Sequence, residues 1–176
     1  MQVIVPRKAI TELLRLLNDS DAEIGLTVNN HHLQMQLGTI RFTTKLIDGR
    51  FPDYERVIPA TGTEIMIADR ETVRMALSRT AILSNEKFRG VRLCLNDGHL
   101  RLQAHNPEHE EAEEDLEVDY NGKGLEIGFN VNYLLDALAC MQADQFILEL
   151  SGPDSSGLLR EQGDEESRYV VMPMRL

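Results

Sequence analysis

One unit of organisation, a strand followed by a helix and three further strands, recurs three times along this sequence. Apolar residues with helical spacing begin at Ile10, Val73 and Val131, at intervals of about sixty residues. Behind each helix the apolar residues alternate with polar ones, which is the period of half-buried strands. Each unit therefore presents one apolar sheet face and one apolar helix stripe, and two units can bury these surfaces against each other.

The start of each unit is marked by residues that suit a helix N-terminus. Pro6 fits the first turn of the first helix, after a short expected strand at Val3-Ile4-Val5. Asp69 and Asn130 are expected N-caps of the second and third helices, because their side-chain oxygens can accept from first-turn N–H groups. Ile65 and Ile67 alternate in the strand before Asp69 and are expected to mark its apolar side.

The three strands after each helix follow from alternation and turn residues. They are expected at residues 24–28, 33–37 and 40–46, at 91–95, 100–104 and 112–120, and at 146–150, near 158 and at 169–174. Asn96-Asp97-Gly98 between two of them is a strong hairpin signal.

A joint at residues 49–59 separates the first unit from the other two. Pro52 and Pro59 argue against a central strand or helix there, and its apolar residues favour an ordered connection over a flexible linker. We expect residues 61–176 to form one domain from two paired units, and residues 1–60 to be half of another. The apolar face of that half is covered either by another chain or by sequence beyond this one.

Composition excludes several classes of protein. A hydrophobic content of 42% with 27% charged residues indicates a globular chain. The apolar runs are too short for a membrane span, and no signal-peptide pattern precedes the first strand. Cys94 and Cys140 have no metal-type spacing and are expected to be reduced core residues of a cytoplasmic protein. The net charge of −11 disfavours uniform coating of nucleic acid but allows a local basic face.

Five stretches spread over the whole chain carry a family resemblance. They are VIVPRK at 3–8, DGRFPDY at 48–54, AILSNEKFRG at 81–90, EIGFN at 126–130 and YVVMPMRL at 169–176. Together they resemble the bacterial DNA polymerase III beta subunit, the sliding-clamp family. The resemblance implies an α+β DNA-clamp fold of three domains, each made of two repeated units, in which two protomers close a ring around duplex DNA. This chain would then hold the second half of the middle domain (1–60) and the complete C-terminal domain (61–176).

The resemblance implies a groove on the last domain that binds short linear motifs of DNA polymerase III and other clamp-binding proteins. Methionine thioethers suit a surface that accepts many partners. The residues that match the family's groove are Pro52, Arg56, Val57, Asn130, Tyr133, Ser156, Val170, Met172, Pro173, Met174, Arg175 and Leu176. Asp154 departs from the small or apolar residue expected there, and part of the pocket wall belongs to the absent half. We therefore expect weaker peptide binding than in a full-length clamp. By pattern alone, residues 169–174 are simply a last strand.

An acidic stretch at residues 108–119 has two interpretations. Alternation places Glu111, Glu113, Asp115, Glu117 and Asp119 on one strand face, which is typical of a solvated edge that resists aggregation. The resemblance implies instead a head-to-tail interface with another clamp protomer, with an apolar centre and a carboxylate rim. Its residues would be Ile82, Leu83, Glu108, Glu110, Glu111, Glu113 and Glu114. Since the opposing surface belongs to the absent first domain, this chain alone is not expected to close a ring.

Basic residues gather on the first two helices. They are Arg7, Lys8, Arg15, Arg70, Arg74 and Arg79. The family lines its ring with such helices, which contact DNA phosphates without reading bases. Arg7 and Lys8 match the family motif and are the predicted DNA-binding residues, although any of the six also suits a solvated helix face.

No catalytic residue, metal or other cofactor is expected. His105 and His109 have a zinc-like spacing, but Pro107 breaks the helix that this spacing requires, so a metal-dependent hydrolase is a remote alternative. The family implies a processivity clamp that also engages a clamp loader and no membrane. Within the family, the alternative is a truncated form that binds clamp partners without encircling DNA.

Overall fold

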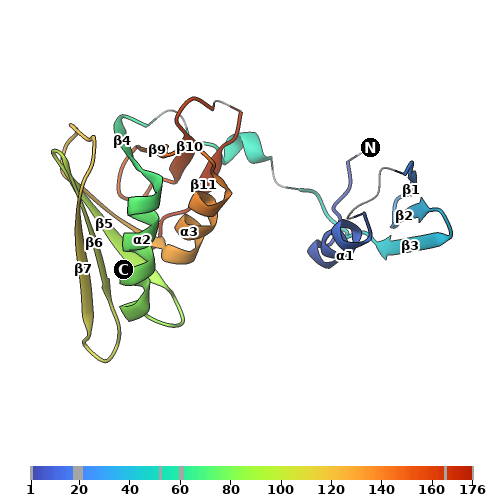
Figure 1. Ribbon diagram of the computed structural model, residues 1–176, viewed down its shortest axis with the longest axis horizontal. Coiled ribbons are helices and arrows are strands. Elements are labelled where there is room, and N and C mark those ends of the chain that lie inside the picture. Colours follow the sequence, from blue (N-terminus) through green and yellow to red (C-terminus); the bar gives the residue numbers. More distant parts are fainter. Residues whose placement is uncertain (1, 18–21, 52, 60–61, 165, 176) are drawn as a thin grey trace. The chain divides into compact units, whose positions relative to one another are not determined.

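The computed structural model describes residues 2–17, 22–51, 53–59, 62–164 and 166–175. The chain divides into two compact units, which we call unit 1 (Met1–Asp53) and unit 2 (Tyr54–Leu176). Figure 1 shows the elements of both, and each unit is described by itself. Among the described residues, no helix is long and apolar enough to cross a membrane.

Unit 1 consists of one helix and one antiparallel sheet. Helix α1 spans Arg7–Leu17, and strands β1 (Gly25–Val28), β2 (His32–Leu37) and β3 (Ile40–Lys45) pair in the order β1-β2-β3. These elements confirm the predicted helix and hairpins. The expected strand at residues 3–5 is reduced to a single bridge between Ile4 and Ile47, so that prediction was too long.

The core of unit 1 is small. Ala9 is the one buried residue of α1, and it is joined in the described interior by Leu33, Met35 and Leu46. The predicted apolar stripe of α1 is present in the sequence but is largely open to solvent. Unit 1 therefore buries only part of the apolar surface that the spacing of its apolar residues predicts to be buried.

Unit 2 holds the second and third repeats as two four-stranded antiparallel sheets. The first sheet has the strand order β11-β10-β9-β4 and the second has the order β7-β6-β5-β8. The elements are β4 (Glu64–Asp69), α2 (Arg70–Thr80), β5 (Gly90–Asn96), β6 (His99–His105), β7 (Glu111–Glu117), β8 (Leu125–Asn130), α3 (Val131–Cys140), β9 (Gln145–Leu150), β10 (Gly157–Glu161) and β11 (Tyr169–Val171).

The two repeats of unit 2 exchange their first strands. β4 opens the second repeat but pairs with β9 of the third, and β8 opens the third repeat but pairs with β5 of the second. Each sheet thus contains three strands of one repeat and one strand of the other. This exchange makes the two repeats interdependent and gives unit 2 a single core.

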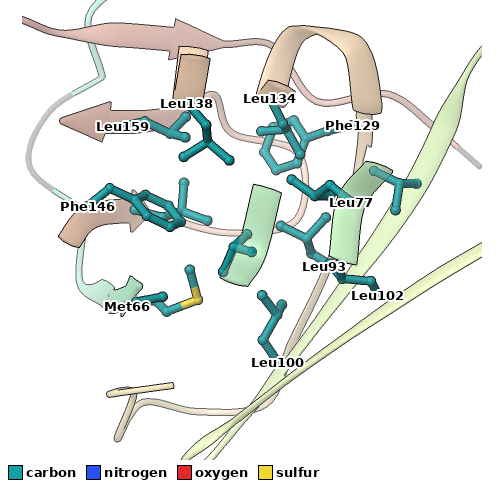
Figure 2. Packing of buried hydrophobic residues seen from close by; sticks show 14 of the residues in the cluster. Met66, Leu77, Leu93, Leu100, Leu102, Phe129, Leu134, Leu138, Phe146 and Leu159 are labelled. Carbon is teal, nitrogen blue, oxygen red and sulfur yellow. The ribbon is translucent and has the colours of Figure 1, made fainter. Parts of the chain in front are cut away.

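Helices α2 and α3 pack against each other and cover the apolar faces of these sheets (Figure 1). The apolar helix positions expected from spacing, including Val73, Leu77, Leu134 and Leu138, are buried. Figure 2 shows Leu77, Leu134 and Leu138 in one cluster with Phe129 and with leucines from both sheets. The second and third repeats therefore bury their stripes against each other, as the sequence pattern predicts.

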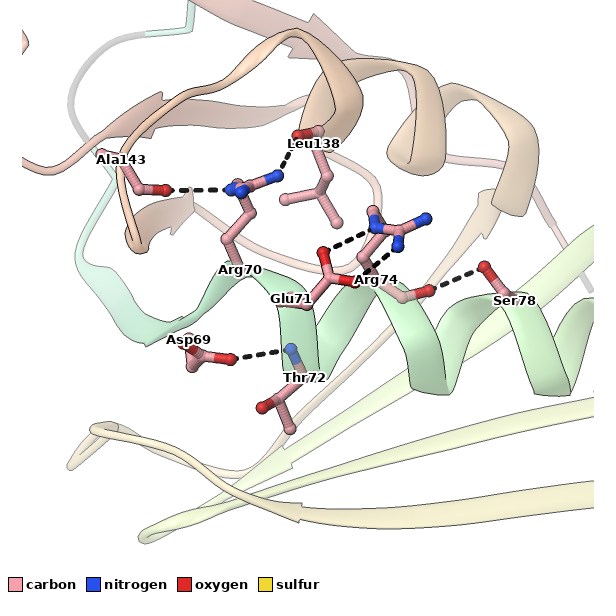
Figure 3. A network of polar contacts seen from close by, with 8 residues as sticks. All are labelled: Asp69, Arg70, Glu71, Thr72, Arg74, Ser78, Leu138 and Ala143. Atoms are coloured by element: carbon pink, nitrogen blue, oxygen red, sulfur yellow. Dashed lines mark hydrogen bonds and ion pairs between the residues drawn. The ribbon is translucent and has the colours of Figure 1, made fainter.

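Both expected helix caps of unit 2 are confirmed. The Asp69 carboxylate accepts a hydrogen bond from the Thr72 N–H at 2.7 Å, and the Asn130 side chain accepts from the Asn132 N–H at 3.0 Å. Hydrogen bonding by the side chain and the backbone N–H of Thr72 lowers the pKa of Asp69 below its ordinary value. Figure 3 shows this cap beside Arg70, whose guanidinium donates across to α3 and the residues after it.

Two expectations for buried faces were wrong. In β4 the buried residues are Met66 and Ala68, whereas Ile65 is 43% exposed, because both faces of this strand are apolar and alternation alone cannot choose between them. Cys140 is exposed at the end of α3, and Cys94 lies on the outer face of β5, where it is half-buried. Both cysteines are free, but neither belongs to the core.

The last strand is also shorter than expected. β11 ends at Val171, and residues 172–175 continue without strand pairing. Pro173 has no N–H to donate to a ladder, which is consistent with the early end. The joint contains one 3₁₀ turn, Tyr54–Arg56, and Phe51, Tyr54 and Val57 within it are exposed.

Candidate functional site

The segment after β11, residues 172–175, is held along the first strand of its own repeat. The Met174 N–H donates to the Gly128 carbonyl of β8 at 2.8 Å. In each of the other two repeats, the chain after the last strand also contacts the first strand. Ile47 forms a β-bridge with Ile4, and Asp119 forms one with Ile67. We call residues 172–175 the tail. Its backbone is fixed while several of its side chains face solvent.

Exposed apolar and polar side chains border the tail. Met172 is 63% exposed, and its sulfur accepts a hydrogen bond from the Ser156 hydroxyl at 2.9 Å. Tyr133, in the first turn of α3, is 60% exposed. Asn130 caps α3 and its amide also donates to the Phe88 carbonyl at 3.1 Å. Asn130 thus has a structural role that positions α3.

Two hollows share tail residues. One of about 380 Å³ is lined by Pro153, Asp154, Pro173, Met174 and Arg175. A larger one of about 540 Å³ also reaches Met174 and Arg175 but opens over the ends of β5, β6 and β7. Met174 and Arg175 therefore separate two concave surfaces of unit 2.

The remaining groove residues are placed as follows. Val170 is half-buried in β11, and Arg56 and Val57 lie in and after the 3₁₀ turn at the start of unit 2. The Val57 N–H donates to the Tyr54 carbonyl at 3.0 Å. Pro52 and Leu176 lie outside the described residues.

The larger hollow itself was not identified from the sequence, although four of its residues were assigned there to the groove or to the protomer interface: Glu111, Glu113, Met174 and Arg175. Its wall includes the outward-facing Arg92, Gln103 and Glu113 on three neighbouring strands. Arg92 pairs with Gln103 in register, and Gln103 pairs with Glu113, to which its amide donates at 2.7 Å. Alternation in β5 and β6 indicated which residues face outward. Only the strand register shows that Arg92, Gln103 and Glu113 lie side by side.

The acidic strand β7 alternates as expected. Glu111, Glu113, Asp115 and Glu117 share an exposed face, and Arg101 of β6 contacts two of them, at 2.8 Å to Asp115 and 3.5 Å to Glu113. These contacts offset part of the repulsion between aligned carboxylates.

Glu114 lies on the opposite face of β7, toward α2. Its carboxylate accepts two hydrogen bonds from Arg79, at 2.6 and 3.0 Å. These bonds lower the pKa of Glu114 and raise that of Arg79. Glu114 therefore joins β7 to α2 and does not share the face of Glu111 and Glu113.

The other predicted interface residues are on loops. Ile82 is 76% exposed in the 3₁₀ turn Ala81–Leu83 that follows α2, and Leu83 is half-buried. Glu108 and Glu110 are exposed in the loop between β6 and β7, where Glu110 accepts from the Asn106 amide at 2.7 Å.

The basic helix residues differ in their contacts. Arg15 pairs with Glu12 at 2.8 Å, and Arg74 pairs with Glu71 at 2.5 Å. Arg70 is half-buried and donates to the Ala143 carbonyl at 2.9 Å.

Arg7 and Lys8 are exposed on the first turn of α1. Neither side chain forms an ion pair with another described residue. Of the six basic residues on the two helices, these two are thus best placed to meet an external anion.

The histidine pair does not form a cluster. His105 ends β6, and His109 lies in the following loop with a φ of 66°. Within the part of the chain that the structure describes, no three His, Cys, Asp or Glu side chains gather as a metal site.

Comparison with known proteins decides the family. A family model described as DNA polymerase III beta subunit, C-terminal domain, matches residues 55–175, and one described as the central domain of that subunit matches residues 1–53. This chain belongs to the DNA polymerase III beta subunit family, the sliding clamps. The fold is accordingly the α+β DNA-clamp fold built from repeated strand–helix–three-strand units.

Individual sliding clamps agree with this assignment. The beta sliding clamp of Pseudomonas putida is 57% identical over 175 residues, which cover 99% of this chain and 48% of that protein. The solved structure of the Pseudomonas aeruginosa subunit is 55% identical with a TM-score of 0.92, covering 100% of this chain and 48% of that one. Another structure of the P. aeruginosa clamp, bound to griselimycin, has a TM-score of 0.89, 55% identity and the same coverage.

The chain spans about half the length of the relatives it matches. The sliding-clamp family is a non-catalytic processivity factor in DNA replication. The matched half includes the tail and the whole of unit 2, together with the single repeat of unit 1.

Proposed function

We propose that this chain acts as the partner-binding portion of a cytoplasmic DNA polymerase III sliding clamp. It would hold DNA polymerase III and other clamp-binding proteins through their short linear motifs, without catalysing a reaction itself. The observation that carries the proposal is the exposed Met172 on a tail whose backbone is bonded to β8 of unit 2. A clamp loader and duplex DNA are the remaining partners of the proposed role.

The chemistry of the tail suits a peptide ligand. Met172 and Tyr133 offer adaptable and rigid apolar surface respectively, and both are more than half exposed before any ligand binds. Arg175 carries five N–H donors and no acceptor, so it can donate to carbonyl groups of an extended peptide. Because the Met174 N–H donates to the Gly128 carbonyl, the tail backbone is positioned before binding, which lowers the entropic cost of association.

DNA contact and protomer pairing are assigned to other surfaces. We propose that Arg7 and Lys8 contact phosphates of duplex DNA, since both are exposed on α1. Ile82 is the proposed centre of the protomer interface in the longer clamp, with Leu83 and the exposed glutamates of β7 and its preceding loop beside it. Glu114 is less available for contact with another protomer, because its carboxylate already accepts a hydrogen bond from Arg79.

The domain assignment belongs to the same proposal. Residues 1–60 would be the second half of the clamp's middle domain, and residues 61–176 its complete C-terminal domain. The alternative within the family is a truncated form that binds clamp partners without encircling DNA.

Fluorescence polarisation with a labelled clamp-motif peptide tests the proposal. We expect saturable binding that is weaker than that of a full-length clamp, and that griselimycin, which is bound in a relative 55% identical, also binds this chain. Met172→Glu should lower peptide affinity at least tenfold, whereas Ile82→Glu, at a still more exposed apolar site away from the tail, should leave it unchanged. Absence of binding, or equal loss in both variants, would reject the tail as the binding surface.

A further inference from the structure

The larger hollow beside the tail lies over glycine positions of the second sheet of unit 2. Gly90 of β5 lines it, and Arg92, two positions along the same face, pairs in register with Gly128 of β8. Glycine in a strand lets another backbone approach closely, and the Gly128 carbonyl accepts the hydrogen bond of the tail. The hollow measures about 540 Å³, a size typical of ligand sites, and all residues that line it belong to unit 2.

An aromatic ring is fixed at one end of this hollow. The Asn85 side chain accepts a hydrogen bond from the Phe88 N–H at 3.0 Å, and the Asn130 amide donates to the Phe88 carbonyl at 3.1 Å. The next residue, Arg89, has a φ of 51°, so the chain turns sharply before β5 begins. The Phe88 ring is 55% exposed and lines the hollow together with Pro107. The backbone of this loop therefore presents an apolar surface in a fixed position.

The hollow also carries opposite charges on its two sides. Arg92 of β5 and Arg175 of the tail line one side, and Glu111 and Glu113 of β7 line the other. One strand, β6, lies between β5 and β7, and neighbouring strands are about 4.8 Å apart, so the two charged sides are about 10 Å apart. Arg92 has a single ion-pair contact among the described residues, with Glu126 at 3.5 Å, and Glu111 forms none with another described residue. Both side chains are therefore available to a charged ligand.

We propose that the larger hollow binds the residues that flank a clamp motif in a partner peptide. It selects a flank with an acidic residue beside the motif and a basic residue three positions further away. This role rests on the proposed function, because the tail residues Met174 and Arg175 line both this hollow and the smaller one. A peptide held at the tail reaches the larger hollow directly. Its acidic group then meets Arg92, and its basic group meets Glu111.

The spacing of three residues follows from the geometry of an extended chain. In the polyproline II conformation, residues i and i+3 lie on one face and about 9 Å apart. That distance matches the separation of β5 from β7. An apolar residue between the two charges lies against Phe88 and Pro107, since aromatic side chains line the grooves that bind polyproline II peptides.

Fluorescence polarisation on the 176-residue chain tests the selection of the flank. The labelled peptides carry the clamp motif alone or with a short flank at one end or the other. Each flank has an aspartate next to the motif, a lysine three positions further away and a leucine between them. In the matched peptide the aspartate and the lysine exchange places, so composition and net charge are the same. We expect the first arrangement, at one of the two ends, to bind at least fivefold more tightly than its exchanged counterpart.

Two variants separate local from overall charge. Glu111→Lys should remove the preference between the two arrangements and leave the affinity of the unflanked motif unchanged. Glu117→Lys is the matched control, because Glu117 is exposed on the same face of β7 but does not line the hollow. It changes the net charge by the same amount and should keep the preference. Both side chains are exposed, so neither change disturbs the core.

Equal affinity of the two arrangements at both ends would reject the hollow as the site of the flank. Loss of the preference in Glu117→Lys as well as in Glu111→Lys would reject it too, because overall charge would then explain the effect. If the unflanked motif still binds in either case, the proposed function stands without the flank site. If no peptide binds, the proposed function and the flank site fail together.

Discussion

Leu14 and Leu77 occupy the same place in two repeats of one fold, yet Leu14 is 67% exposed and Leu77 is 1% exposed. The difference does not come from the local sequence, because both helices carry an apolar stripe. It comes from whether a second repeat is present to cover the stripe. Unit 2 contains both partners of that packing, and unit 1 contains one.

This difference predicts unequal costs for the same substitution. Leu77→Ala should lower the free energy of unfolding of unit 2 by about 2–5 kcal/mol, since it creates a cavity in a closed core. Leu14→Ala should leave that transition unchanged. Tyrosine fluorescence during urea unfolding measures it selectively, because the chain has no tryptophan and its 4 tyrosines all lie in unit 2. Equal losses in the two variants would contradict the division into independent units.

A buried ion pair in the first sheet of unit 2 makes a second prediction. The Arg160 guanidinium donates to the Glu149 carboxylate at 2.7 Å, and the Glu149 side chain is 5% exposed. Arg160→Met should cost about 3–5 kcal/mol of stability, because it leaves a buried carboxylate without its cation. The double variant Glu149→Met with Arg160→Met should lose clearly less, as measured by urea unfolding. If Arg160→Met left the free energy of unfolding unchanged, the ion pair would contribute nothing to stability.

The Asp69 cap predicts a pH-dependent stability difference. Asp69→Ala should destabilise unit 2 by about 1 kcal/mol at neutral pH, because the Thr72 N–H loses its acceptor. The pKa of Asp69 is lowered in the folded state, so its charge stabilises the protein above the unfolded-state pKa, near 3.8. This contribution disappears as the pH falls through the lower folded-state pKa.

Asp69→Asn is the matched control, since it keeps an acceptor oxygen but cannot ionise. The stability difference between wild type and Asp69→Asn should therefore shrink when thermal unfolding is followed from pH 6 toward pH 3. A difference that stays constant over that range would mean that the carboxylate charge is not part of the cap.

The basic residues of α1 predict a salt-dependent DNA contact. Combining Arg7→Ala with Lys8→Ala should weaken binding to duplex DNA and reduce the slope of log affinity against log salt by about 1–2. The matched control removes Arg74 together with its partner Glu71, an ion pair of zero net charge, and should leave both quantities unchanged. Anisotropy with a labelled duplex at several salt concentrations measures both. An unchanged slope in the first variant would reject Arg7 and Lys8 as phosphate contacts.

Much of the fold could be predicted from the sequence, because periodicity and caps are local signals. Asp69 and Asn130 mark helix starts through chemistry that needs no tertiary context. The strand exchange could not be predicted, because nothing in the sequence of β4 or β8 distinguishes pairing within a repeat from pairing between repeats. The prediction of the buried face of β4 was wrong for a related reason. Ile65 and Met66 are both apolar, and only the surrounding elements decide which of them is buried.

The candidate site divides in the same way. The tail was indicated by a family resemblance, whereas its pattern alone described a last strand that in fact ends at Val171. The ion pairs of Arg79 with Glu114 and of Arg101 with Asp115 depend on register and on helix placement. The contact of Arg79, which the sequence could not supply, separates this α2 residue from Arg7 and Lys8 on α1.

The most direct test of the central claim is methionine methyl NMR during titration with a clamp-motif peptide. The chain has 7 methionines, among them the tail residues Met172 and Met174, the buried Met66, and Met75 exposed on α2. We predict saturable shifts of the Met172 and Met174 signals, with Met66 and Met75 unchanged. Shifts confined to Met75, or no shift at any methionine, would contradict a partner-binding tail.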